Sequence, residues 1–246
     1  MIDFYYWPTP NGWKVSILLE ELGLPYETKI TNISKGDQFT PEFLAISPNN
    51  RMPAIVDHDV QGDPVSIFES GAIMWYLAEK TGRFMPADPL GRKEVMEWLF
   101  WQTGNQGPMG GQHSHFFNYA PEDVRKQGYA FERYERETYR CLGVLERRLE
   151  GREWIVGDEY SIADMAIMPW YGSMSKGILY EAAEFLSVHE YKNVIRWTDQ
   201  LSERPAVQRG RMVNRVWGEP SSQLPERHDA SDFELRTMDK LQPEET

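Results

Sequence analysis

The first third of the chain combines short apolar runs with one amphipathic stretch. Residues 2–7 are a β-prone run, and a turn rich in Pro and Gly follows them. Residues 14–23 carry apolar side chains at helical spacing and end in Gly23, a residue typical of helix C-termini. Residues 26–33 alternate as a second strand would. This order predicts two parallel strands joined by a right-handed crossover.

Two further strands and a helix complete this part of the pattern. Residues 54–58 and 65–67 predict strands, and the Gly-Asp-Pro sequence between them suits a hairpin. Residues 70–80 predict a helix that ends at a Thr-Gly pair. Residues 1–82 therefore predict an α/β domain with its elements in thioredoxin-like order.

The pattern changes after this domain. Residues 83–91 contain two Pro and one Gly and are interpreted as a linker. Residues 92–217 predict an all-helical domain, in which Ser161 and Asp164 form a capping-box-like helix start. The predicted helices cover residues 92–105, 121–150, 161–178 and 190–203.

The last segment, residues 218–246, differs in composition. It is polar and has eight acidic residues against three basic ones. Such a composition is typical of a flexible tail. The alternative is a tail that packs on the body of the protein or on a partner.

Composition and charge exclude several classes of function. The chain has 246 residues and a formal net charge of −12, which disfavours binding to nucleic-acid phosphates. One cysteine excludes a disulfide framework and a CxxC motif. With no signal peptide and no long apolar run, we expect a cytoplasmic protein without a membrane segment. His113 and His115 lack an evident third ligand, so we expect no metal.

The turn before the first helix has the chemistry of an anion site. Residues 8–12 (PTPNG) would place free backbone N–H groups and the positive end of the helix dipole at one point, which stabilises an anion such as a thiolate. Thr9 and Asn11 add side-chain donors. The alternative is that Thr9 or Asn11 only caps the helix.

Two other turns carry complementary groups. The Met52–Pro53 bond precedes a strand, and a cis bond there would expose the backbone of Met52 to an extended peptide; an ordinary trans proline is the alternative. Glu69 and Ser70 begin another helix, where Ser70 suits a carboxylate and Glu69 an ammonium, unless they serve only as a cap. Together the three turns would recognise a short peptide with a carboxylate, an ammonium and a thiol.

The motifs PTPNG, SPNNRMPAIVD, SIFESGAIMWYLAEK and SIADMAIMPW resemble, in this order and spacing, those of cytosolic glutathione transferases. PTPNG, GDQFTPEFLAISPNN and the stretch around GPMGGQHSHFFNYAPE and YAFERY are similar to the bacterial Nu class, whose relatives include the yeast nitrogen-regulating prion protein. The resemblance covers about residues 1–215. It implies a thioredoxin-like α/β domain, an all-α glutathione transferase domain after it, and a homodimer.

The resemblance also implies how glutathione would bind to the α/β domain. Met52 and Pro53 would hold the cysteinyl backbone of glutathione at a cis-proline site. Glu69 and Ser70 would hold the γ-glutamyl end.

The remaining implied contacts surround the sulfur and the glycyl end. Thr9 and Asn11 would lie beside the sulfur. Gln38 and Arg51 would lie near the glycyl end or the surrounding backbone. Arg133 matches an arginine that the Nu class brings from the helical domain towards glutathione, where its bond to a carboxylate would be charge-assisted.

Tyr6 departs from the Nu pattern, which has an apolar aromatic residue at this place. Tyrosine-type glutathione transferases carry their thiol-activating hydroxyl at the end of the first strand, where Tyr6 stands. Strand alternation puts Phe4 and Tyr6 on one face. Tyr6 therefore either donates to the sulfur or packs in the core.

The resemblance favours an enzyme that ionises glutathione and uses it for disulfide reduction. Lowering a thiol pKa by about two units stabilises the thiolate by roughly 2.7 kcal/mol. Cys141 lies in an apolar helical pattern, so glutathione would supply both electrons through a mixed disulfide. Attack on a small electrophile or on a glutathione thioether would use the same residues. The alternative is a non-catalytic regulatory or ligand-carrier module.

Overall fold

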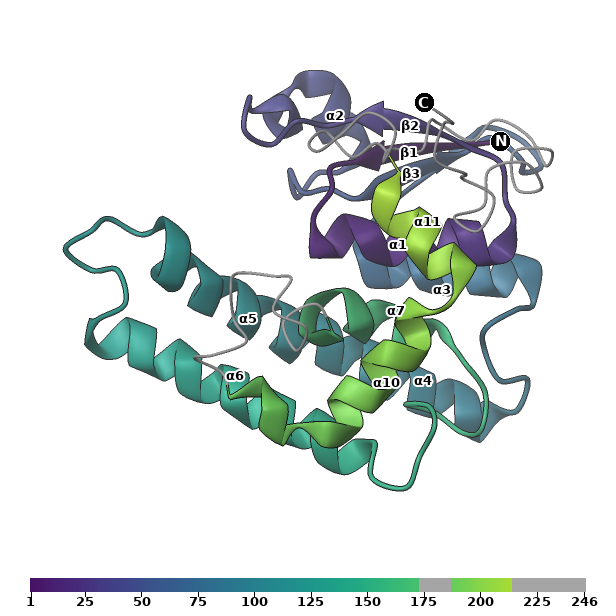
Figure 1. Ribbon diagram of the computed structural model, residues 1–246. Coiled ribbons are helices and arrows are strands. Elements are labelled where there is room, and N and C mark those ends of the chain that lie inside the picture. The colour runs from purple at the N-terminus through teal and green to yellow at the C-terminus, as the bar shows by residue number, and fades with distance from the viewer. Residues whose placement is uncertain (173–186, 214–246) are drawn as a thin grey trace, which may run out of the picture. The chain divides into compact units, whose positions relative to one another are not determined.

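The computed structural model describes residues 1–172 and 187–213 (Figure 1). These residues form two compact units, one made of residues 1–83 and 202–213, the other of residues 84–172 and 187–201. The acidic tail expected at 218–246 lies outside the described residues.

The first unit is built on a four-stranded mixed sheet in the order β2-β1-β3-β4. β1 pairs parallel with β2 and antiparallel with β3, and β3 pairs antiparallel with β4. The parallel pair and the hairpin predicted from the sequence are therefore both confirmed. The strands are β1 (Ile2–Tyr6), β2 (Tyr26–Ile30), β3 (Ala54–Asp57) and β4 (Val65–Phe68).

Figure 1 shows three helices of this unit on one face of the sheet: α1 (Pro10–Leu22), α3 (Ser70–Thr81) and α11 (Pro205–Met212). The 3₁₀-helix η1 (Asp37–Phe39) and α2 (Pro41–Ile46) lie in the connection between β2 and β3. Most of α1 is buried, and the buried residues include the polar side chains of Lys14, Ser16 and Glu20, which have hydrogen-bond partners.

α1 begins four residues earlier than the apolar periodicity predicts. Pro10 stands in its first turn, and the Thr9 side chain caps it by accepting a hydrogen bond from the Gly12 N–H at 3.4 Å. A Cβ at Gly12 would lie 2.4 Å from the Trp7 carbonyl oxygen, so this close approach requires glycine. Pro10 and Gly12 therefore belong to the first turn of a helix and not to a loop.

α11 follows the helical unit in the sequence but packs on α1 of the first unit. The Ser16 hydroxyl donates to the Gly210 carbonyl at 2.5 Å, and a Cβ at Gly210 would lie 2.6 Å from Ile17 Cα. Arg209 Nε donates to Glu20 Oε2 at 2.8 Å, and both side chains are buried. The sequence predicted one helical domain over residues 92–217, so the prediction did not include the packing of α11 on the first unit.

The described elements of the second unit are all helices. Three of them (η2, η3 and η4) are π-helical turns that continue an α-helix, and η5 is a 3₁₀-helix. The elements are α4 (Pro89–Trp101), η2 (Gln102–Gln106), α5 (Gly107–Ser114), η3 (His115–Tyr119), α6 (Gly128–Arg148), α7 (Ile162–Ile167), η4 (Met168–Gly172), η5 (Val188–Glu190) and α10 (Lys192–Ser202).

Two helix predictions in this unit were wrong in extent. The helix expected at 92–105 runs on through π-helical turns and α5 as far as Tyr119, although Gly104, Gly107 and Pro108 suggest a break. The helix expected at 121–150 begins only at Gly128, because residues 121–127 form an exposed turn. The last part of the helix expected at 161–178 lies outside the described residues.

The capping box predicted at α7 is confirmed. Asp164 Oδ2 accepts from the Ser161 N–H at 3.1 Å, and Asp164 Oδ1 accepts from the Ile155 N–H at 3.0 Å and from Trp197 Nε1 at 2.9 Å. Burial raises the pKa of the Asp164 carboxyl to about 6 against these bonds. One buried carboxyl thus ties α7 to α10.

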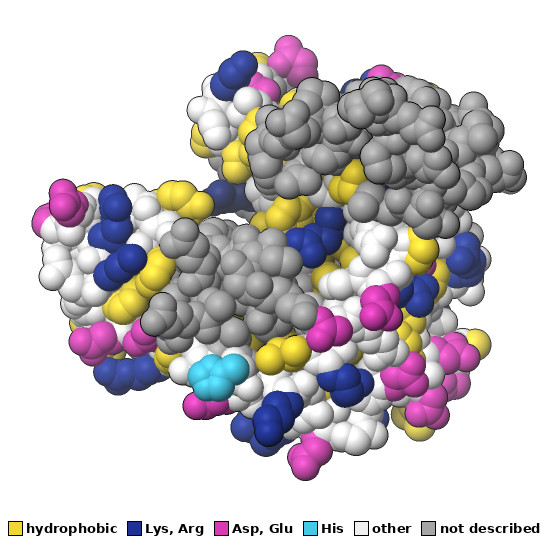
Figure 2. All heavy atoms as spheres, viewed as in Figure 1, with side chains coloured by type: hydrophobic (Ala, Val, Ile, Leu, Met, Phe, Trp, Pro, Cys, Tyr) yellow, Lys and Arg dark blue, Asp and Glu magenta, His cyan; other side chains and the backbone are white. Residues whose placement is uncertain are grey.

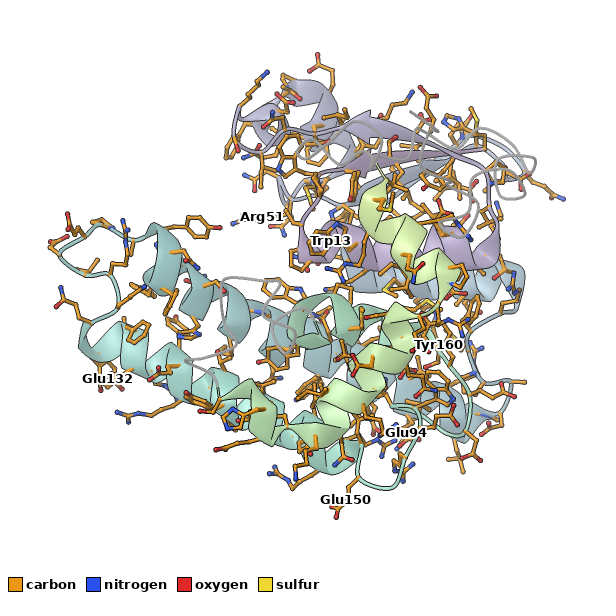
Figure 3. All side chains as sticks on the ribbon, viewed as in Figure 1. Trp13, Arg51, Glu94, Glu132, Glu150 and Tyr160 are labelled. Atoms are coloured by element: carbon orange, nitrogen blue, oxygen red, sulfur yellow. The ribbon has the colours of Figure 1, made fainter. Side chains whose placement is uncertain are left out.

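Charged side chains of both signs are interspersed over the face drawn in Figure 2. Several form ion pairs. Lys93 pairs with Glu97 at 3.0 Å, and Arg148 pairs with Glu94; Figure 3 labels Glu94. Among residues 1–172 and 187–213, no helix is long and apolar enough to cross a membrane.

Candidate functional site

Thr9 joins two of the three turns that the sequence singled out. Its hydroxyl caps α1 and also lies 3.8 Å from Met52 Sδ, to which it donates. The Met52–Pro53 bond that precedes β3 is cis, as predicted. The N-terminus of α1 and the entrance of β3 are therefore neighbours in the fold, because β1 and β3 pair antiparallel.

Asn11 is the second residue of α1 and is half-buried. The first turn of a helix directs its N–H groups outward along the axis, and the helix dipole adds positive potential there. Trp13, labelled in Figure 3, belongs to the same turn and is buried. This end of α1 can therefore stabilise an anion next to Thr9 and Met52.

The third turn presents a carboxylate and a helix N-terminus together. Glu69 is the N-cap residue of α3 and has a φ of 70°, which is uncommon for a residue other than glycine. Its side chain is exposed, and Oε1 accepts from Asn49 Nδ2 at 3.1 Å. Ser70 follows as the first residue of α3 and is buried. The turn thus offers a negative side chain beside the positive end of a helix.

Lys14 approaches this third turn from α1, and sequence reasoning missed it. It is 2% exposed, and its Nζ donates to Ser70 Oγ at 3.3 Å. Burial lowers the pKa of the Lys14 ammonium to about 7, and the charge of Glu69 acts in the opposite direction. The available signal was a lysine on the same helical face as Ile17 and Leu18, both of which are buried.

Gln38 and Arg51 lie in the connection between β2 and β3. Gln38 is in η1, and its Nε2 donates to the Ile33 carbonyl at 3.3 Å. The Arg51 carbonyl accepts from the Ser47 hydroxyl at 2.8 Å, while the Arg51 side chain is exposed (Figure 3). The backbone at Arg51 is thus fixed from the core side, just before Met52.

The Tyr6 hydroxyl is buried in the interior of the first unit. Tyr6 is 1% exposed, and its ring lies 4.9 Å from that of Phe4, so the two share a face as predicted. Burial raises the pKa of the Tyr6 phenol, against the opposing effect of the neighbouring Trp13 and Ser16. This environment favours the neutral, packed hydroxyl.

Arg133 belongs to the second unit, on α6. Its side chain is exposed, and Nη1 donates to Glu137 Oε1 at 2.5 Å. Arg140 bonds to the same carboxylate at 2.8 Å, and together these arginines lower the Glu137 pKa. The contact of Arg133 with glutathione stays a prediction.

His113 and Cys141 are interior residues of the second unit. His113 packs against Phe117 and Phe131, and burial lowers its pKa to about 4. No group of three or more potential metal-ligating side chains (His, Cys, Asp or Glu) occurs in the part of the chain that the structure describes. Cys141 is buried, and burial raises the pKa of its thiol, which keeps it protonated and unreactive.

Both parts of the chain match known family models. Residues 9–80 match the N-terminal domain of glutathione S-transferase, and residues 113–205 match its C-terminal domain. The disulfide-bond oxidoreductase YghU of Escherichia coli (strain K12) is 47% identical over 98% of this chain and 84% of that protein. The disulfide-bond oxidoreductase YfcG of the same organism is 46% identical over 84% of this chain and 93% of that protein.

Solved structures agree with the sequence matches. A glutathione transferase of Burkholderia graminis with two glutathione molecules bound per subunit has a TM-score of 0.82 and 46% identity, covering 88% of this chain and 89% of that one. A glutathione transferase of Pseudomonas putida with one glutathione disulfide per subunit has a TM-score of 0.81 and 43% identity, covering 88% of this chain and 92% of that one. This chain belongs to the glutathione transferase family.

Proposed function

We propose that this protein is a glutathione-dependent disulfide-bond oxidoreductase of the Nu class. The observation that carries the proposal is the junction of the α1 N-terminus with the Met52–Pro53 entrance of β3, made through Thr9. A thiol held at this junction lies against the positive end of α1. The relatives that are named disulfide-bond oxidoreductases, at 47% and 46% identity, support this reaction over conjugation.

Glutathione would lie along the three turns of the first unit. Its γ-glutamyl ammonium would pair with Glu69 and its carboxylate with Ser70 at the start of α3. The backbone of its cysteine would bond to Met52 beside Pro53. This arrangement places opposite charges together at the γ-glutamyl end.

The sulfur and the glycyl end would use the other predicted residues. Thr9 and Asn11 would donate hydrogen bonds to the thiolate. Gln38 and Arg51 would lie near the glycyl end, on the connection between β2 and β3. Arg133 would supply a further charge-assisted bond to glutathione from α6.

The reaction would proceed by two thiol–disulfide exchanges. The bound glutathione thiolate attacks one sulfur of the substrate disulfide, forms a mixed disulfide and releases the other half as a thiolate, which takes up a proton. A second glutathione thiolate then attacks the mixed disulfide and yields glutathione disulfide and the second substrate thiol. Two glutathione molecules are oxidised for each disulfide reduced, and Cys141 takes no part.

We also propose that the protein is a cytoplasmic homodimer. A reducing compartment keeps glutathione as the thiol. Exposed apolar side chains on α4 favour a partner: Leu90 is 76% and Phe100 is 69% exposed. Light scattering in solution measures the oligomeric state. A monomer at micromolar concentration would contradict this part of the proposal.

The reaction is tested by following glutathione-dependent reduction of 2-hydroxyethyl disulfide through NADPH consumption by a coupling glutathione reductase. We expect fast disulfide turnover and slow conjugation of an aromatic halide. Cys141→Ala should retain the turnover, and a large loss would contradict the mechanism. Slow turnover in both assays despite glutathione binding would favour a lyase acting on glutathione thioethers, or a regulatory or carrier role.

A further inference from the structure

Lys14 is a charged residue in the interior of the first unit. Its Nζ lies 3.3 Å from Ser70 Oγ, and both residues are buried. A buried ammonium is costly unless an opposite charge or a hydrogen-bond acceptor stabilises it. Glu69, next to Ser70, attracts this ammonium, but desolvation has the larger effect and lowers the Lys14 pKa to about 7.

The helices that pack against α1 carry other charged groups with partners of their own. Arg209 of α11 bonds to Glu20 at 2.8 Å, and the Arg211 guanidinium lies 5.3 Å from the centre of an indole ring of α1. Glu69, at the start of α3, is the carboxylate whose charge acts on Lys14. At the start of α3, the negative Glu69 side chain therefore lies near the ionisable Lys14 side chain, which comes from α1.

We propose that Lys14 is a positioning residue for glutathione. The Lys14 ammonium donates to Ser70 Oγ and so turns the Ser70 O–H towards the bound γ-glutamyl carboxylate. The proposal rests on the assignment of the γ-glutamyl end to Glu69 and Ser70. An ammonium has only donors, so the Ser70 oxygen accepts from it and keeps its own hydrogen for the ligand. A neutral amine also accepts, and would compete for that hydrogen.

The charges at this turn are complementary to those at the γ-glutamyl end of glutathione. The γ-glutamyl end carries an ammonium and a carboxylate, while Glu69 offers a carboxylate and Lys14 an ammonium. A bound carboxylate stabilises the charged form of Lys14, so the amine takes up a proton when the ligand binds. Because the free amine titrates near pH 7, the uptake is about half a proton at pH 7 and about one at pH 8.

Calorimetry with S-methylglutathione measures this uptake directly. This ligand has no thiol proton to release, and the proton exchange of its own amino group is common to the wild type and the variants, so the difference between them belongs to Lys14. Titrations at pH 7 and pH 8 in buffers of different ionisation enthalpy give the number of protons taken up by the wild type. We expect Lys14→Met to abolish the uptake and to weaken binding by about 10-fold or more.

A matched control is Lys29→Met on β2, where the lysine forms an ion pair with Glu27 at 2.5 Å near the surface. It should keep both the affinity and the proton uptake. Binding by the wild type without proton uptake overturns the role of Lys14 and leaves glutathione binding intact; this result needs no variant. Failure of the wild type to bind S-methylglutathione contradicts the proposed function itself, and the role of Lys14 with it.

Discussion

The Thr9 hydroxyl is 3.8 Å from the sulfur of Met52, and it caps α1 at the same time. One short side chain thereby holds the first turn of a helix next to the entrance of a strand. A ligand that bonded to the backbone of Met52, as proposed, would have its next atoms near the positive end of α1. In the proposed function, peptide binding and thiolate stabilisation would depend on the same contact.

Asn11→Ala should impair ionisation of the bound thiol more than binding. The loss of one hydrogen bond to a charged sulfur predicts a decrease in kcat of about 10-fold or more and a higher pKa for the bound thiol. Ultraviolet absorbance of the thiolate against pH measures that pKa, and the coupled disulfide assay measures kcat. Thr9→Ser, which keeps a hydroxyl cap, is the control and should stay near wild type. An unchanged pKa and kcat in Asn11→Ala would remove Asn11 from the site.

Tyr6→Phe should leave the thiol chemistry nearly intact. The phenol is buried beside Trp13 and Ser16, and its raised pKa favours a neutral packing group. We expect kcat to stay within about 2-fold of wild type. The free energy of unfolding should change by about 1 kcal/mol, because one buried polar group is lost. The same absorbance titration serves as the readout. A rise of the bound-thiol pKa together with a 10-fold fall in kcat would instead assign thiol activation to Tyr6.

The buried pair of Arg209 and Glu20 should be a main attachment of α11 to the first unit. Arg209→Met removes the ion-pair partner of the buried Glu20 carboxylate, which keeps the hydrogen bond from the Tyr26 hydroxyl at 2.8 Å. Removing one partner of a buried pair costs about 3–5 kcal/mol. Urea unfolding followed by tryptophan fluorescence measures this loss.

The surface pair of Lys93 and Glu97 provides the comparison, since both side chains are more than half exposed. Lys93→Met should cost less than about 1 kcal/mol. The double variant Glu20→Gln/Arg209→Met should recover part of the loss, because no buried charge remains unpaired. If Arg209→Met cost no more than Lys93→Met, the pair would not hold α11.

Hydrophobic periodicity predicts the sheet and most helices but not every helix boundary. The start of α1 was missed because Pro10, Asn11 and Gly12 are also typical of loops; the Thr9 cap makes them helical. The helix through Gly104 and Pro108 was predicted too short, because π-helical turns carry it past residues that usually end a helix. In both places a local structural feature outweighs the composition.

The candidate site was predictable where its chemistry lies in adjacent residues. Thr9 with Asn11, Met52 with Pro53, and Glu69 with Ser70 are sequence neighbours, and their turns are visible in the pattern. The contact between Lys14 and Ser70 depends on how α1 packs against α3, which no local pattern contains. Asn49, which bonds to Glu69, lies in a motif of the resemblance, but the sequence assigned it no role.

The pH dependence of stability tests the environment of Lys14 without any ligand. The amine has a pKa of about 7 in the folded protein and of about 10.5 when exposed in the unfolded chain. Between these values the unfolded state binds more protons, so the free energy of unfolding should rise with pH, by at most about 1.4 kcal/mol per pH unit from this residue. Lys14→Met removes this contribution, and the difference between the two proteins isolates it from other titrating groups.

Urea unfolding of wild type and Lys14→Met at pH 6, 7, 8 and 9 gives the measurement. We expect the difference in unfolding free energy to change by about 1 kcal/mol between pH 7 and pH 8, and by only about 0.4 kcal/mol between pH 6 and pH 7. Lys29→Met should show no such slope relative to wild type in the same range. If the curves of wild type and Lys14→Met were parallel from pH 6 to 9, the amine would titrate outside this range. The folded protein would then hold Lys14 in its charged form at neutral pH. In that case the interactions that stabilise the ammonium would outweigh the cost of its desolvation.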